Sequence, residues 1–243
     1  MQIEVYPTDA DALEAAAALA AERIRSAAHG GRAVVAVGGG RAGRGVMVAL
    51  AGRGDLPWAC VEWCLADERC GSAHDALRHG KIARDSLFGP RGIAAAKIHE
   101  PSLDAGDPEG IAASYTDVLR AVAGDAVTFD VVLLAVGADG SLGALTPGAP
   151  ALCATAPVAV VPAPTGTREP ARVTVTPAVL ARAGHVIVTA VGPAVAPAVA
   201  RALRGGDGPA ALMRPSERVT WVVDRPAATE LLKDARAVDA AAR

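Results

Sequence analysis

Residues 129–148 read FDVVLLAVGADGSLGALTPG, a buried strand that runs directly into a glycine-rich turn. The segment 129–136 is almost wholly apolar, which is typical of a parallel strand covered on both faces. The turn that follows, 137–143, contains three glycines with Asp139 and Ser141 between them. A flexible turn at the carboxyl end of such a strand is a common place for a ligand site.

Strand-like and helix-like segments alternate on both sides of this stretch. Alternation of this kind predicts an α/β fold whose mostly parallel sheet carries helices on both faces. No long linker or tandem repeat interrupts the pattern, so we expect residues 1–243 to form a single domain. The expected strands are 3–7, 32–40, 58–69, 95–100, 129–136, 156–161, 171–176, 185–192 and 218–224. The expected helices are 10–28, 41–52, 80–89, 108–123, 177–183, 193–205 and 225–237.

The composition excludes several classes of protein. The chain has 26 acidic and 24 basic residues and a formal charge of −2, which argues against a binder of duplex nucleic acid. No stretch reaches the ~18 to 20 uncharged apolar residues that cross a bilayer, so no membrane partner is expected. The first residues lack the basic start and apolar run of a signal peptide, and we expect a cytoplasmic protein.

The first stretch that could bind an anion is VGGGRAGRG, residues 37–45. It ends a strand and opens a helix, so the amides of Gly38, Gly39 and Gly40 could surround a phosphate, with Arg41 adding charge. It is neither a Walker A loop nor a clean GxGxxG turn. The alternative is a tight turn between strand and helix.

The second stretch is WCLADERC, residues 63–70, where charged residues end a buried strand. Asp67 could orient a water or accept bonds from sugar hydroxyls, and Arg69 offers a planar fork for phosphate or carboxylate. The alternative is an ion pair within this stretch. The third stretch is the turn 137–143, whose amides around Gly140 could hold an anion or a developing oxyanion, or simply close a tight turn. We expect the three strand ends to meet in one cleft.

The histidines do not form a zinc pattern, and no metal site is expected. His74 and His79 follow the second stretch and could reach the same cleft, although such residues are more often solvated loop positions. No GxSxG elbow supports a serine hydrolase.

In this order, the stretches resemble the 6-phosphogluconolactonase family, which belongs with the glucosamine-6-phosphate deaminases. The resemblance implies their α/β fold and hydrolysis of 6-phospho-glucono-1,5-lactone to 6-phosphogluconate in the pentose phosphate pathway. It also implies a sugar phosphate as the partner, no cofactor, and a monomer or small homo-oligomer. The matching segments are GGG at 38–40, W with DER at 63–69, FDVVLLAVGADGSLGALTPG at 129–148, PAPTGTREPARVTVT at 162–176 and WVVDRPAA at 221–228.

The chain departs from the family at the position where the resemblance implies a residue that transfers protons. The family's Gly-Asp-Gly-His motif ends on a histidine regarded as the acid/base, and this chain has Ser141 there. A serine hydroxyl titrates far above neutral pH and cannot replace an imidazole without help. Asp139 is retained, a family asparagine falls near His79, and a family lysine corresponds to Val195. Asp67, Asp139, Ser141 and His79, the last as a substitute base, are the catalytic candidates.

The same resemblance suggests which residues bind the anion. Arg69 and Arg172 are the first candidates and Arg41 and Arg168 the weaker ones, each with a solvated surface arginine as the alternative. The segment 162–170 is proline- and glycine-rich and is a candidate mobile loop at the site. Three functions stay open: a lactonase with a relocated base, a non-catalytic sugar-phosphate binder, or a scaffold that keeps only the fold. We expect weak or absent turnover, with ligand binding better retained.

Overall fold

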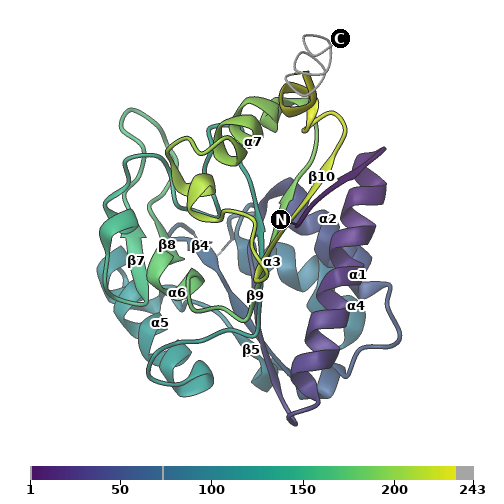
Figure 1. Cartoon of the computed structure of the whole chain (residues 1–243). Helices are drawn as coiled ribbons and strands as arrows, with labels where there is room; N and C mark the ends of the chain where they lie inside the picture. The colour runs from purple at the N-terminus through teal and green to yellow at the C-terminus, as the bar shows by residue number, and fades with distance from the viewer. Residues whose placement is uncertain (1, 73, 234–243) are drawn as a thin grey trace, which may run out of the picture.

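A seven-stranded parallel sheet forms the centre of the chain in the computed structural model, which describes residues 2–72 and 74–233 (Figure 1). Every strand pair in this sheet is parallel. The strands are β1 (Gln2–Tyr6), β2 (Ala33–Val37), β3 (Val61–Leu65), β5 (Ile98–His99), β6 (Val131–Ala135), β9 (His185–Ala190) and β10 (Val219–Asp224). Their order in space is β1-β10-β9-β6-β2-β3-β5.

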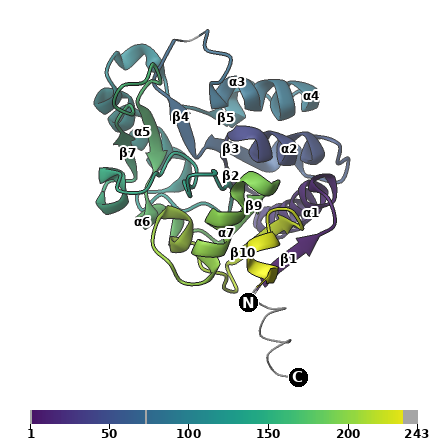
Figure 2. The same cartoon turned by 90° about the horizontal axis from the view of Figure 1, so that it is seen from above.

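Helices cover both faces of the sheet, as the view from above shows (Figure 2). On one face lie α1 (Asp9–Ala28), α2 (Gly40–Ala51), α3 (His79–Ala83) and α4 (Gly89–Arg91). On the other lie α5 (Pro108–Ala123), α6 (Pro177–Leu180) and α7 (Ala196–Leu203). The mostly parallel α/β fold predicted from the sequence is therefore confirmed.

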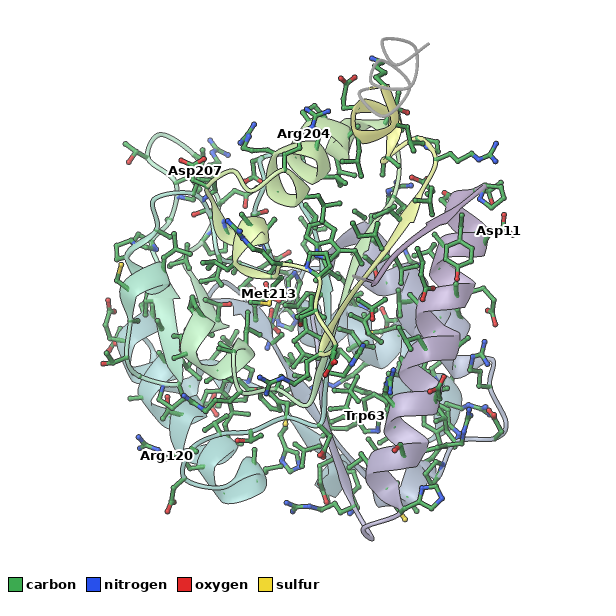
Figure 3. The ribbon with its side chains drawn as sticks, viewed as in Figure 1. Asp11, Trp63, Arg120, Arg204, Asp207 and Met213 are labelled. Atoms are coloured by element: carbon green, nitrogen blue, oxygen red, sulfur yellow. The ribbon has the colours of Figure 1, made fainter. Side chains whose placement is uncertain are left out.

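The central strand β2 has no alternation of polar and apolar residues, because both of its faces are buried. All five of its residues are buried, because Val34 and Ala36 pack into the core on the α5 side while Val35 and Val37 pack into the core on the α1 side. A strand covered on both faces needs apolar side chains at every position. Trp63 on β3, which is labelled in Figure 3, is fully buried in the core on the α1 side.

A second, smaller sheet corrects one sequence prediction. The segment 58–69 was expected to be one strand, but the chain changes sheets at Ala66. The Ala66 amide donates to the Val37 carbonyl at 2.8 Å, and its carbonyl accepts from the Val175 amide at 2.8 Å. One residue thus bonds to both sheets, and the next residues begin a new strand. The second sheet is antiparallel, in the order β4-β8-β7, and comprises β4 (Asp67–Arg69), β7 (Val158–Val161) and β8 (Arg172–Val175).

Several element boundaries also differ from the prediction. The helix expected over 80–89 is α3, then a π-helical turn (Arg84–Phe88), then α4. The expected strand 95–100 is reduced to the two residues of β5, whereas helix α5 has the predicted bounds. The helix expected over 225–237 is helical over 229–233, and its remainder lies outside the described residues. Within the described part of the chain, no helix is long and apolar enough to cross a membrane.

The α5 side of the sheet gives a first testable prediction. Tyr115 on α5 is 2% exposed, and its hydroxyl donates to the Leu65 carbonyl at 2.7 Å and accepts from the Leu65 amide at 2.9 Å. Tyr115→Phe should lower the free energy of unfolding by about 1–3 kcal/mol, because it leaves a buried amide without an acceptor. Urea denaturation measures this change.

Tyr6→Phe is the matched control. The Tyr6 hydroxyl is only part-buried and donates to the Glu4 carboxylate, so its loss should change stability by about 0.5 kcal/mol or less. A Tyr115→Phe effect as small as that of the control would contradict the proposed role of the buried hydroxyl.

Candidate active site

A pocket of about 320 Å³ lies where the carboxyl ends of β2, β6 and β9 meet the start of α3. The chain leaves β2 for β3 on one side, whereas β6 lies on the other side of β2. Open α/β sheets bind ligands at such a change of direction. The pocket is lined by Gly39, Gly40, Arg41, Ala42, His79, Ala135, Val136, Gly137, Ser141, Gly143, Arg172, Val191, Ala194 and Val195.

The glycines after β2 leave room for a histidine. A Cβ on Gly39 would lie 2.1 Å from Cδ2 and 2.3 Å from Nε2 of His79, so any side chain there would displace the imidazole. Gly40 has a φ of +78°, and its backbone begins helix α2. Gly38 is not part of the pocket lining, and its amide donates to the Leu133 carbonyl at 2.8 Å. The three glycines therefore shape the wall against which His79 packs.

The imidazole of His79 is held by Asp67. Nδ1 of His79 lies 3.1 Å from the Asp67 carbonyl oxygen and 3.1 Å from Asp67 Oδ1. Nε2 has no hydrogen-bond partner among the described residues, while the ring lines the pocket. A proton on Nδ1 would therefore leave Nε2 as an acceptor on the pocket side.

The pKa of His79 reflects two opposing effects. Burial of the ring is the largest single effect and lowers the pKa, because it opposes the charged form, whereas the Asp67 carboxylate raises the pKa through its charge and its hydrogen bond. The charge of Glu68 adds to this and that of Arg172 opposes it, and the net pKa is raised above the ordinary 6.5.

Asp67 is present at the site but closed to the pocket. Its residue is 1% exposed, and apart from the 3.1 Å contact of Oδ1 with Nδ1 of His79, neither carboxylate oxygen has a hydrogen-bond partner within the described residues. Cβ atoms placed on Gly38 and Gly143 would lie 3.6 and 3.8 Å from Asp67 Oδ1, so these glycines cover the carboxylate. A buried carboxylate with so few hydrogen bonds is costly unless a donor or cation lies beside it, which favours a proton on Nδ1 of His79 and favours the imidazolium once Nε2 has taken a second proton.

Glu68 fixes the segment that carries His79, a role that the sequence did not indicate. The side chain is fully buried, and its two oxygens accept from the amides of Arg69 at 2.7 Å, His79 at 2.8 Å and Gly80 at 2.9 Å. The Arg78 guanidinium lies 3.2 Å from Glu68 Oε2. With its oxygens occupied, Glu68 positions the start of α3 and is not open to a ligand.

The turn after β6 presents Ser141 and not Asp139 to the pocket. Asp139 is exposed at the tip, where its Oδ1 accepts from the Ser141 amide at 3.0 Å, and it does not line the pocket. Gly140 has a φ of +85°, and its amide donates to the Gly137 carbonyl at 3.0 Å. These amides bond within the turn, so Asp139 and Gly140 shape it while Ser141 faces the cavity.

The four arginines predicted to bind an anion divide into two groups. Arg41 and Arg172 line the pocket, and Arg41 Nη2 donates to the Val191 carbonyl at 2.9 Å. Arg69 does not line it, because its guanidinium pairs with two carboxylates instead. Arg168 is exposed and also lies outside the pocket lining.

Apart from the family lysine position at Val195, the sequence predicted no part of the site at the end of β9. Val191, Ala194 and Val195 line the pocket, and the Gly192 amide between them donates to the buried Asp224 carboxylate at 3.0 Å. The signal was available, because an apolar strand followed by glycine and proline repeats the pattern that singled out residues 129–148. Val195, where the resemblance places a lysine, adds an apolar wall.

Two further features bear on the choice of site. A larger cavity of about 580 Å³ lies beside α6 and Met213 (Figure 3), but its lining is mostly apolar and holds no histidine or cysteine. We therefore favour the smaller pocket, where titratable groups converge.

Across residues 2–72 and 74–233, no group of three or more histidine, cysteine or acidic side chains could hold a metal ion.

Known proteins are similar to this chain in sequence and in fold. A 6-phosphogluconolactonase of Mycobacterium tuberculosis is 32% identical over 242 residues, covering 94% of this chain and 98% of the relative. The structure of 6-phosphogluconolactonase from Trypanosoma brucei has a TM-score of 0.82 at 24% identity, covering 95% of this chain and 98% of that one. A monomeric glucosamine-6-phosphate deaminase has a TM-score of 0.81 at 20% identity, covering 94% and 99%.

The two structural neighbours carry different names on one fold, so they show the fold alone. The family assignment rests on sequence. The family model described as glucosamine-6-phosphate isomerases/6-phosphogluconolactonase matches residues 7–221, which span β2, β6, β9 and the whole pocket. With the mycobacterial relative aligned along nearly its full length, this chain belongs to the glucosamine-6-phosphate isomerase/6-phosphogluconolactonase family.

Proposed function

We propose that this chain is a slow 6-phosphogluconolactonase, in which His79 takes the proton-transfer role that the family motif would give to residue 141. The observation that carries the proposal is the His79–Asp67 pair, separated by 3.1 Å at the wall of the pocket that also contains Ser141. The name shared by the curated relatives gives the reaction, hydrolysis of 6-phospho-glucono-1,5-lactone to 6-phosphogluconate.

His79 is the group best placed to activate water. Its Nε2 is free of partners among the described residues, whereas both Asp67 oxygens are buried. In the proposed reaction, Nε2 takes a proton from the water that attacks the lactone carbonyl, and the Asp67 carboxylate stabilises the resulting imidazolium. Ser141 can only hydrogen-bond the substrate or the water, because its hydroxyl does not titrate near neutral pH.

The anionic end of the substrate has separate partners in this proposal. The first amides of α2 have no acceptor within the helix, and Gly40 and Arg41 at this helix start line the pocket. The guanidinium groups of Arg41 and Arg172 add positive charge to the same wall. These groups would hold a phosphate without a metal or cofactor.

A second candidate function is supported by Ser141 itself. With no imidazole on the turn after β6, the same pocket could bind a sugar phosphate without turning it over, as a sensor or regulatory protein. We further propose a single domain over residues 1–243, a cytoplasmic location, and a monomer or small homo-oligomer with neither nucleic acid nor membrane as a partner.

Removing the imidazole tests the role of His79. His79→Gln should lower kcat for 6-phosphogluconolactone hydrolysis by about 10²-fold or more, which is the usual contribution of a general base. The assay follows lactone loss against the spontaneous rate, with 6-phosphogluconate binding measured in parallel. His29→Gln, an exposed histidine at the end of α1, is the control and should leave kcat unchanged. Unaltered turnover in folded His79→Gln would refute the assignment.

Restoring the family residue tests the role of position 141. Ser141→His should raise kcat by about tenfold or more, because it returns a base to the turn whose Ser141 side chain lines the pocket. The double variant His79→Gln/Ser141→His separates the two bases and should keep most of the gained activity. A loss of turnover in the single variant would mean that this turn no longer presents residue 141 to the lactone carbonyl.

The proposed pair also predicts a pH dependence. Because the neutral imidazole is the base, kcat/KM should rise as the pH increases through the raised pKa of His79. Asp67→Asn removes the main group that raises this pKa, so the rise should move to lower pH and its plateau should fall. NMR titration should show the pKa of His79 falling in this variant, while that of His185, which burial lowers, stays unchanged. An unshifted His79 would contradict the pairing.

A further inference from the structure

Arg69 and Arg172 face each other across the small sheet. They are directly opposed in the antiparallel pairing of β4 with β8. Both guanidinium groups reach the same atom, Oε2 of Glu169, which lies 3.3 Å from Arg69 Nη1 and 3.4 Å from Arg172 Nη2. Like charges directly opposite each other on neighbouring strands are destabilising, so this arrangement requires an anion between them.

The two arginines differ in how strongly the protein holds them. The Arg69 side chain is 9% exposed and has a second partner, Asp75, at 2.8 Å from its Nε. Burial lowers the pKa of Arg69, but its bonds to Asp75 and Glu169 outweigh burial and raise it. Arg172 is 30% exposed, lines the pocket, and has Glu169 as its one carboxylate partner within the described residues. Glu169 therefore neutralises Arg172, the member of the pair that lines the cavity.

Glu169 lies on a loop that can release it easily. Every residue from 162 to 169 is exposed, and half of the Glu169 side chain is open to solvent. The loop is ordered by a turn in which Thr167 bonds to the Pro164 carbonyl, and no residue of 162–169 belongs to either core cluster. Exposed ion pairs contribute little to stability, and segments with few buried contacts open at low cost.

We propose that Glu169 is an internal counter-ion for Arg69 and Arg172, that the phosphate of an incoming ligand displaces it from Arg172, and that it thereby sets the selectivity for phosphorylated ligands. A phosphate monoester carries a charge of about −1.5 to −2 and three acceptor oxygens, whereas the carboxylate carries one charge. The dianion therefore replaces Glu169 at Arg172, the arginine of the pair that lines the pocket together with Arg41, while an uncharged sugar hydroxyl does not. This inference rests on the proposed function only for its choice of ligand.

The test is Glu169→Gln, which keeps the size of the side chain and removes its charge. The dissociation constant of 6-phosphogluconate, measured by calorimetry, should fall by about three- to tenfold, as expected when a half-exposed carboxylate that competes for Arg172 loses its charge. Binding of gluconate, which lacks the phosphate, should change by less than about twofold. Glu217→Gln is the control, because it removes an equal charge from an exposed residue outside the pocket lining.

The outcomes separate this inference from the proposed function. If neither wild type nor variant hydrolyses the lactone but Glu169→Gln binds 6-phosphogluconate more tightly, the lactonase function fails and the counter-ion role stands. An unchanged or weakened affinity for 6-phosphogluconate would overturn the counter-ion role, since Glu169 would then be structural. Equal tightening toward gluconate would overturn the selectivity, and equal tightening in Glu217→Gln would reduce the effect to overall charge.

Discussion

The arrangement of the site depends on one buried carboxylate, that of Glu68. It accepts hydrogen bonds from three backbone amides and forms an ion pair with Arg78. These contacts join the end of β4 to the start of α3 across the loop that separates them. Breaking a buried charge cluster of this kind commonly costs about 3–5 kcal/mol, because the remaining groups stay desolvated. Glu68 therefore fixes the start of α3, and with it the backbone of His79, relative to β4.

Because Glu68 fixes the backbone of His79, the ring has only one place to lie. Asp67 lies on one side of it, and the Cα of Gly39 lies against its face. Ala66 adds a second constraint, since its bonds to both sheets set the direction in which Asp67 leaves β3. The imidazole is thus held by three chain segments that meet at the strand ends, which is the preorganisation that proton transfer requires.

The sequence predicted the location of the site better than its contents. Apolar strands followed by glycines identify strand ends, and parallel strands bring these ends to one edge, so the pocket could be predicted. The sequence could not predict which side chains face the pocket, because neighbouring residues of an extended chain point to opposite sides and a shift of one residue exchanges them. Arg69 and Arg172 show a second limit, since they are directly opposed and share one face of the small sheet. Arg69 stays out of the pocket lining because Asp75 and Glu169 hold its guanidinium, whereas Arg172 also lines the pocket. No periodicity signals the change of sheet at Ala66.

A relocated base is physically reasonable because the scaffold does not depend on residue 141. The turn after β6 is closed by its own amides and by Asp139, and none of these bonds uses the side chain of residue 141. Substituting this residue therefore removes chemistry without disturbing the backbone. The start of α3 differs, because the scaffold around it does depend on the side chain present. His79 is packed so closely there that Gly39 cannot carry a side chain. A histidine placed there must have its surroundings shaped around it, and the buried Asp67 beside its Nδ1 is the feature that a merely space-filling residue would not need.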